Sequence, residues 1–311
     1  MKSKNLIIIF IVLLLVYGGI TLFGDKKDRS FDDNIVDFKI DNVDKLVITP
    51  KEKNKEKFEL KKSNNEWKIS TETDEYLAEK SIVDNALSSL SKMKVKNIVT
   101  KNPEKFSKYE LENDNCKRVE VYSGSDKLSD VMIGKFKYDP QTRMASSYVR
   151  LSGKDEVYST DGFSGINISD NVNTYRIKTI ADFDPANLKS IKLNKSGINR
   201  EIVKQGDEWV VDNIVLDSTK MKSFISTMSK MKGSKFIDNS SEIQNLENPE
   251  QLNLVMVDKS INIEAYPDTL ISKGFIIHSS ENPKAYFDSD SAGIYKRIFG
   301  TIDDLLKEVG K

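Results

Sequence analysis

The feature that most constrains this chain is a hairpin pattern that occurs twice. Trp67 and Trp209 are the only tryptophans, and each directly follows a glutamate in a polar turn, SNNEW or QGDEW. Apolar residues alternate on either side of the first turn, as they do in a half-buried hairpin. Asn64-Asn65 and Gly206-Asp207 tolerate the positive φ angles of tight turns. The repetition predicts two copies of one structural unit in tandem.

A helical pattern follows each hairpin. Apolar residues recur at i, i+3, i+4 and i+7, which is typical of an amphipathic helix lying on a sheet. The two sets align without a gap: Val83, Ala86, Leu87, Leu90 and Met93, and Met221, Phe224, Ile225, Met228 and Met231. Asp217 is the expected N-cap of the second helix. Both stripes end in the tetrapeptide SKMK, at Ser91–Lys94 and Ser229–Lys232, whose basic residues suit a helix C-terminus.

The pattern in the remainder of each copy predicts a meander of strands. A short strand, VKNIVT or GSKFID, precedes a Leu-Glu-Asn loop and several further strands. We therefore expect an α+β fold: an N-terminal transmembrane helix, then a tandem duplication of an antiparallel-sheet unit with one packed helix each. The copies either fold separately or share one sheet. The expected divisions are an anchor (1–24), a juxtamembrane linker (25–42), a first repeat (43–168), a connector (169–187) and a second repeat (188–311) closed by a helix from Ile294 to about Val309.

The N-terminus carries an uncharged apolar run, Leu6–Phe23, about long enough to cross a bilayer as a helix. A cleaved signal peptide is the rival interpretation, but no Ala-x-Ala site follows the run. A lipoprotein would need a cysteine directly after it, and the one cysteine is Cys116. We expect an uncleaved anchor that contacts membrane lipid. Basic residues before and after the run nearly balance, and we expect the N-terminus inside the bacterial cytoplasmic membrane and the bulk of the chain outside.

Composition excludes several functions. The chain has 48 Lys and Arg against 48 Asp and Glu, and this zero net charge argues against nucleic-acid binding. One cysteine excludes a disulfide framework and a cysteine-based metal site. One histidine leaves no HExxH motif, and neither a P-loop nor a GxGxxG sequence is present.

Two short motifs resemble known sites without meeting their requirements. Ser164 lies in Gly-Phe-Ser-Gly, which lacks the GxSxG spacing of a nucleophile elbow and reads as a turn. The segment Asp288–Gly293 resembles the start of a calcium loop, but its twelfth position is Phe299 where a bidentate glutamate is needed. A solvated turn before the last helix is the expected structure.

Single polar residues are interpreted as structural. His278 aligns with Leu151 of the first copy, which argues against a general base. Asp182 and Asp184 flank Phe183 in the connector, where solvated carboxylates are expected. Cys116 is expected to be a buried, inert thiol, and the alternating charges from Lys51 to Lys57 a solvated loop. A set of aromatic residues is expected to pack within the sheets, with a stacking platform for sugars or bases as the alternative: Tyr148, Tyr158, Phe275, Tyr286 and Phe287. We therefore expect no catalytic residue, cofactor or metal.

The order of motifs in the first copy resembles a known family. SNNEW is followed by ALSSLSKMKVKNIV, KYELEND, DVMIGK and YVRLSGKDEVYST, from about Val43 to Phe163. This order resembles the bacterial family called domain of unknown function 4340. The second copy departs from it, because DVMIGK becomes IEAYPD. The resemblance implies an exported or membrane-anchored protein, often encoded beside an ABC transporter permease and a gliding-motility-type protein. It implies no catalytic residues.

These features favour a non-catalytic extracytoplasmic scaffold or accessory subunit of an ABC-transporter-like membrane complex, with protein partners. The alternative is an envelope ligand-binding module for peptidoglycan or another glycan. An enzyme is the third hypothesis. A large exposed apolar patch would favour the first, and a concave pocket with convergent polar groups the second.

Overall fold

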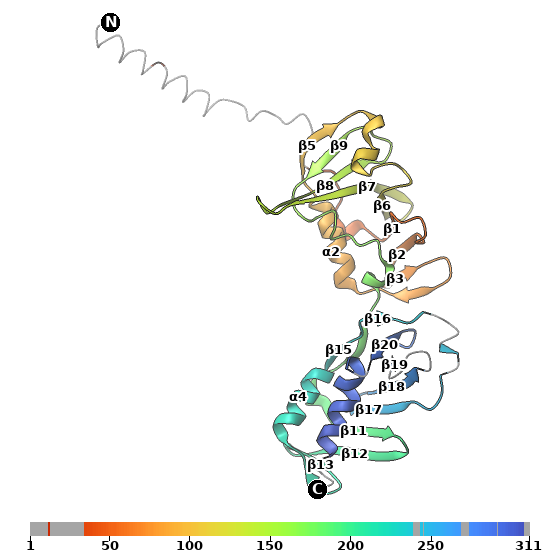
Figure 1. Cartoon of the computed structure of the whole chain (residues 1–311), viewed down its shortest axis with the longest axis vertical. Coiled ribbons are helices and arrows are strands. Elements are labelled where there is room, and N and C mark those ends of the chain that lie inside the picture. The colour runs from red at the N-terminus through yellow and green to blue at the C-terminus, as the bar shows by residue number, and fades with distance from the viewer. Residues whose placement is uncertain are drawn as a thin grey trace, which may run out of the picture. The chain divides into compact units, whose positions relative to one another are not determined.

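The computed structural model describes residues 12, 34–238, 243–244, 246–268, 274–290 and 292–307. The chain divides into two compact units, Met1–Thr174 and Tyr175–Lys311. Each unit contains its own nine-stranded antiparallel sheet, so the two halves do not share one (Figure 1).

The first unit is built around the strand order β4-β3-β2-β1-β6-β7-β8-β9-β5. Its strands are β1 (Lys45–Thr49), β2 (Phe58–Ser63), β3 (Glu66–Ser70), β4 (Glu75–Leu77), β5 (Val95–Thr100), β6 (Lys117–Ser123), β7 (Asp126–Asp139), β8 (Met144–Leu151) and β9 (Val157–Thr160). Its helical segments are η1 (Ile40–Asn42), α2 (Lys80–Ser91), η2 (Pro103–Lys105), η3 (Ser107–Tyr109) and α3 (Val172–Tyr175), the last of which runs into the second unit.

The second unit has the order β14-β13-β12-β11-β17-β18-β19-β20-β16, which is the same path through the sheet. Its strands are β11 (Leu188–Lys195), β12 (Ile198–Gln205), β13 (Glu208–Val211), β14 (Ile214–Val215), β16 (Lys235–Phe236), β17 (Glu250–Met256), β18 (Ser260–Asp268), β19 (Gly274–Ser279) and β20 (Tyr286–Asp290). A separate two-stranded sheet joins β10 (Thr179–Asp182) to β15 (Lys230–Lys232). Its helical segments are η4 (Pro185–Asn187), α4 (Ser218–Met228), η5 (Lys296–Gly300) and α6 (Thr301–Leu306).

The local sequence explains the hairpins and helices. Asn64 and Asn65 have φ angles of 50° and 68°, as a tight turn between twisted strands requires. Trp67 and Trp209 are only 3% and 7% exposed. The ten apolar residues of the two stripes are all buried, and Asp217 accepts a hydrogen bond from the Lys220 amide at 2.8 Å. Burial of both tryptophans, burial of both stripes and the Asp217 cap are therefore confirmed.

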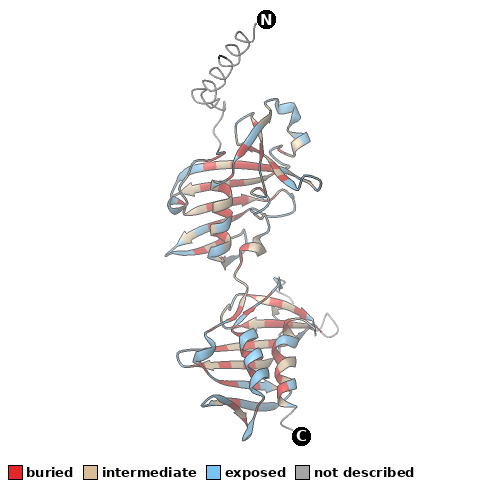
Figure 2. Cartoon of the chain, turned by 90° about the vertical axis from the view of Figure 1, so that its left-hand side faces the viewer, coloured by how far each residue is buried: buried red, intermediate tan, exposed pale blue. Residues whose placement is uncertain are grey.

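One face of the second sheet is covered by helices. In Figure 2 two helices lie over its strands with their buried residues turned toward the sheet (Figure 2). Residues of α4 and of the C-terminal segment share one hydrophobic cluster with the central strands. The core of this unit therefore lies between the helices and one sheet face.

The expected α+β class is wrong: the chain is mostly β. Each large sheet has nine strands, whereas the helices α2 and α4 have only 12 and 11 residues. Two clear helical stripes indicate more helix than the structure contains, and edge strands such as β4 and β14 are too short to show an alternating pattern. No helix among the described residues is long and apolar enough to cross a membrane. The predicted transmembrane run, Leu6–Phe23, lies outside the described residues except for Val12.

The expectation that the second helix ends in SKMK is also wrong. The helix α4 ends at Met228, and Lys230–Lys232 forms the strand β15, paired with β10. Its lysines therefore stand on a strand and do not compensate a helix dipole. The expected C-terminal helix is present: the chain is helical from Ile294 through η5 and α6 to Leu306, and residues 308–311 lie outside the described residues.

Candidate functional site

The most exposed group of large apolar side chains in the first unit lies near the end of the β7–β8 hairpin. We call it the hairpin patch, and its members are Phe136, Tyr138, Phe163 and Ile166. Tyr138, Phe163 and Ile166 are 47% or 48% exposed. The ring of Phe163 lies 5.8 Å from that of Phe136 and 6.4 Å from that of Tyr138. The patch thus combines clustered aromatic rings with solvent exposure.

The length of β7 places the patch beyond the rest of the sheet. Residues 126–133 of β7 pair with β6, whereas residues 136–139 pair with β8 alone after an irregularity between Ile133 and Phe136. The far end of this hairpin projects from the unit (Figure 1). The sequence KFKY puts Phe136 and Tyr138 on one strand face, and their partners across the pair are the small residues Ser147 and Ala145. Small partners leave both rings uncovered.

A loop after β9 brings Phe163 and Ile166 to the hairpin. A side chain at Gly165 would place a Cβ only 2.3 Å from Ser147 Oγ, so the close approach requires glycine. The Lys117 ammonium donates to the carbonyl oxygens of Gly165, at 2.9 Å, and Ile168. Burial lowers the pKa of Lys117 to about 8. These contacts hold the loop against the sheet and fix the patch.

The same hairpin carries three exposed cations. Lys135, Lys137 and Arg143 form no ion pair within the part of the chain that the structure describes. Arginine and aromatic side chains are enriched at the cores of protein–protein interfaces, whereas lysine is depleted there. The hairpin therefore combines exposed aromatic rings with exposed basic side chains.

His278 lies in a hydrogen-bonded network on the second sheet. Its Nδ1 lies 3.1 Å from Glu264 Oε2, its Nε2 lies 3.2 Å from the Pro283 carbonyl oxygen, and its ring stacks on Tyr286 with centroids 4.6 Å apart. Burial alone would raise the pKa of Glu264, but hydrogen bonds from Tyr266 and His278 lower it. Both ring nitrogens have partners, so the imidazole is held in place.

The strand register corrects the residue that was matched with His278. The two sheets can be aligned strand by strand, starting from Trp67 and Trp209. In this alignment Val131 corresponds to Ile263. Leu151, the partner of Val131, therefore corresponds to Ser279, the partner of Ile263. His278 therefore corresponds to Arg150, and not to Leu151. A slip of one residue exchanges the two faces of a sheet. The predicted match put the histidine on the wrong face.

The structure separates the other candidate carboxylates. Asp182 pairs with Lys230, whereas Asp184 caps η4 by accepting from the Ala186 amide at 2.9 Å. Asp288 pairs with Lys235 at 2.7 Å, and Asp290 Oδ1 accepts from the Ala292 amide at 3.0 Å. Each of these four carboxylates has a local partner, and a structural role accounts for each contact.

The candidate nucleophiles, Ser164 and Cys116, belong to the first unit. Ser164 is half-buried in a turn. Cys116 is buried, and burial raises the pKa of its thiol to about 11, which suppresses the reactive thiolate. Within the described residues, no three His, Cys, Asp or Glu side chains are grouped so that they could hold a metal ion.

Tyr148, Phe275, Tyr286 and Phe287 pack against other rings. Tyr148 lies 4.7 Å from Tyr109, Phe275 stacks on Tyr295 at 3.5 Å, and Phe287 is fully buried beside Phe236. The hairpin patch was missed in the sequence. Its signal was the alternation of aromatic and basic residues in KFKY, on a strand whose partner offers no large side chain.

Fold and site together define a protein of two β-sheet units with an exposed aromatic hairpin. Residues 70–249, more than half of the chain, match the family described as domain of unknown function (DUF4340), and the chain belongs to that family. The matched segment crosses the boundary between the units, from the end of β3 to the start of β17. No curated protein and no solved structure gives a significant match.

Proposed function

We propose that this protein is a non-catalytic scaffold that binds a protein partner through the hairpin patch. The observation that carries the proposal is the exposed cluster of Phe136, Tyr138 and Phe163 on a projecting hairpin. Exposed clusters of large apolar side chains often mark binding surfaces in soluble domains.

The charge of the hairpin favours a partner with acidic side chains around an apolar pocket. Lys135 and Lys137 alternate with the aromatic rings along β7 and so lie on the other face of the strand, from which they would steer association more than add affinity. Aromatic side chains such as Tyr138 are the residues that most often dominate binding energy when they enter a pocket.

The proposed setting is a membrane complex of the ABC-transporter type, on the extracytoplasmic side of the bacterial cytoplasmic membrane. The uncharged run Leu6–Phe23 and membership of the DUF4340 family support this setting. The partner would then be an integral membrane subunit or a protein bound to one.

Position-specific crosslinking in living cells tests the proposal. A photoreactive phenylalanine analogue replaces Tyr138 in the full chain, and a matched chain carries it at Leu77, an exposed residue on the edge strand β4. We expect one dominant crosslinked protein from position 138, and less than about a tenth of that yield from position 77. Equal yields from both positions, or none from position 138, would refute the proposal.

A double substitution separates binding from folding. Tyr138→Ser with Phe163→Ser should abolish co-purification of the crosslinked partner from solubilised membranes. The thermal midpoint should change little, because both side chains are about half exposed. Leu77→Ser is the control, and retention of the partner by the double variant would contradict the assignment.

A further inference from the structure

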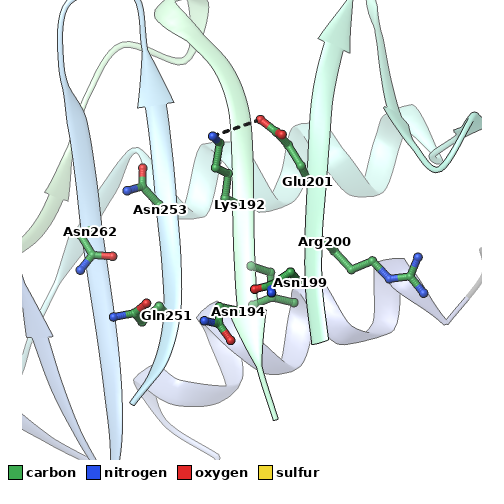
Figure 3. Close-up of a pocket in the computed structure, with 9 residues that line it drawn as sticks. Lys192, Asn194, Asn199, Arg200, Glu201, Gln251, Asn253 and Asn262 are labelled. Atoms are coloured by element: carbon green, nitrogen blue, oxygen red, sulfur yellow. Dashed lines mark ion pairs between the residues drawn. The ribbon is translucent and has the colours of Figure 1, made fainter. Parts of the chain in front are cut away.

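A groove lined by amide side chains crosses the outer face of the second sheet. Figure 3 shows it from the side opposite the helices, which lie behind the strands (Figure 3). The cavity measures about 380 Å³, within the usual range of ligand pockets. Its lining includes five amide residues from four neighbouring strands, and we call it the amide groove: Asn194, Asn199, Gln251, Asn253 and Asn262.

The strand register arranges these side chains in two rows. In one row Glu201, Lys192, Asn253 and Asn262 face one another across β12, β11, β17 and β18. In the other row Asn199, Asn194, Gln251 and Glu264 do the same. Neighbouring strands lie about 4.8 Å apart, so a row of four side chains spans roughly 14 Å. Residues two apart along a strand lie about 6.7 Å apart, which is the distance between the two rows. The amide groove thus presents a regular, elongated grid of polar groups.

The hydrogen-bonding capacity of this grid is only partly used. Gln251 and Asn262 donate to Glu264 Oε1 at 3.3 Å and 3.1 Å. Asn253 Oδ1 is shielded from solvent and has no hydrogen-bond partner among the described residues. An orphaned amide oxygen of this kind is unusual. A ligand hydroxyl would satisfy it after the side chain turns toward the groove.

The cations that line the amide groove are paired. Lys192 pairs with Glu201 at 3.6 Å, and Arg200 pairs with Asp212. A phosphate or a carboxylate would therefore find no free cation here among the described residues. Apart from Leu193, the lining residues are polar or charged. Amides both donate and accept hydrogen bonds, which suits neighbouring hydroxyl groups that do the same.

We propose that the amide groove binds a neutral linear oligosaccharide that lies across the strands. The rows give an extended chain of sugar rings a series of equivalent contacts. Tyr266, His278 and Tyr286 continue the polar surface beyond Glu264. This site is in the second unit, uses no residue of the hairpin patch, and stands independently of the proposed partner binding.

Calorimetric titration of the full chain with two neutral tetrasaccharides tests the site. Cellotetraose and the tetramer of N-acetylglucosamine are the probes, at up to about 5 mM. Binding of at least one is expected, and the pair Asn194→Ala with Asn253→Ala should weaken it at least about tenfold. Gln205→Ala is the control, since this amide lies on β12 but outside the groove. It should bind like the unaltered chain.

Amide spectroscopy locates the contact. In a chain labelled with ¹⁵N-asparagine, the side-chain resonances of Asn194, Asn253 and Asn262 should shift on titration, while that of Asn282, outside the groove, should not. Failure of both sugars to bind, or equal binding by the double variant, would overturn the proposal. Shifts confined to residues outside the groove would do so too.

Discussion

The two sheets have the same topology, but their outer faces carry different side chains at equivalent positions. In the first unit Glu120 stands opposite Asp130 on β6 and β7. At the corresponding place in the second unit Asn253 stands opposite Asn262 on β17 and β18. Two carboxylates in one unit thus correspond to two amides in the other.

Ion pairs close the face of the first unit. The Arg118 guanidinium donates to both oxygens of Asp130, one of them at 2.7 Å, and Lys127 bonds both Glu120 and Asp130. Both carboxylates are 15% exposed. This cluster satisfies itself and leaves little capacity for a ligand, whereas the amide groove keeps unused donors and acceptors.

The contrast shows which face of a repeated unit packing constrains. Under the helices α2 and α4 both units keep the same apolar pattern, including Trp67 and Trp209, because a core tolerates few changes of volume or polarity. Most of the outer face has no such requirement, although in the first unit part of it packs Met132 against Leu111, Cys116 and Val157. It is therefore the face on which the two units can acquire different functions.

The largest effect is expected where the units agree. Trp67→Ala and Trp209→Ala should each lower the free energy of unfolding of their own unit by about 3–5 kcal/mol, since each removes a buried aromatic side chain. Denaturant unfolding, followed for each unit by hydrogen exchange, measures both. Leu77→Ala, at an exposed position, should change stability by less than about 0.5 kcal/mol. A near-neutral result at either tryptophan would break the equivalence of the two cores.

The sequence was informative where periodicity was strong. The tryptophan hairpins, both helical stripes and the Asp217 cap could be predicted because local patterns specify them. The edge strands β4 and β14 could not, since two or three residues carry no period. Nor could the faces of β8 and β19, because pairing His278 with Leu151 instead of Arg150 depends on a register that only the assembled sheet defines.

A second prediction concerns this corrected pair. The Arg150 guanidinium donates to the carbonyl oxygens of Leu111 and Lys154 at 3.1 and 3.2 Å and lies 4.3 Å from the Phe106 ring centroid. Arg150→Met should cost about 2–4 kcal/mol, because it leaves carbonyl groups without donors. His278→Ala should cost only about 1 kcal/mol.

Hydrogen exchange distinguishes the two variants. Arg150→Met should release protection in residues 102–115, the segment that the arginine holds, and leave the second unit unchanged. A loss at His278→Ala equal to that at Arg150→Met would show that the two residues hold their units equally.

The third prediction uses the two carboxylates whose pKa values are lowered on these faces. Burial alone would raise both, but Arg118 and Lys127 lower the pKa of Asp130, and Tyr266 and His278 lower that of Glu264. A lowered pKa contributes stability above the usual value, 3.8 for Asp130 and 4.5 for Glu264, and that stability is lost as pH falls through the folded-state pKa.

Asp130→Asn and Glu264→Gln should therefore flatten the acid limb of their own unit below about pH 4.5. Each should cost about 1 kcal/mol or less at pH 7, after allowance for solvent screening. Thermal unfolding between about pH 3 and pH 7 measures the limb. An acid limb that stays as steep in a variant as in the unaltered chain would refute the assignment for that carboxylate.

The smallest expected effect separates the kinds of bond on the two faces. The partners of Asp130 are the cations Arg118 and Lys127, whereas Glu264 is bonded by the neutral donors Gln251, Asn262 and Tyr266 and by His278, which can carry a charge. Salt screens charge–charge attraction at these partly exposed positions much more than it weakens neutral hydrogen bonds. Raising NaCl from about 0.05 M to about 0.5 M should therefore reduce the cost of Asp130→Asn by a few tenths of a kcal/mol and leave that of Glu264→Gln nearly constant. If both costs fell together, the outer face of the second unit would be held by charge as the first is, and the contrast between ion pairs and amides would not describe the two faces.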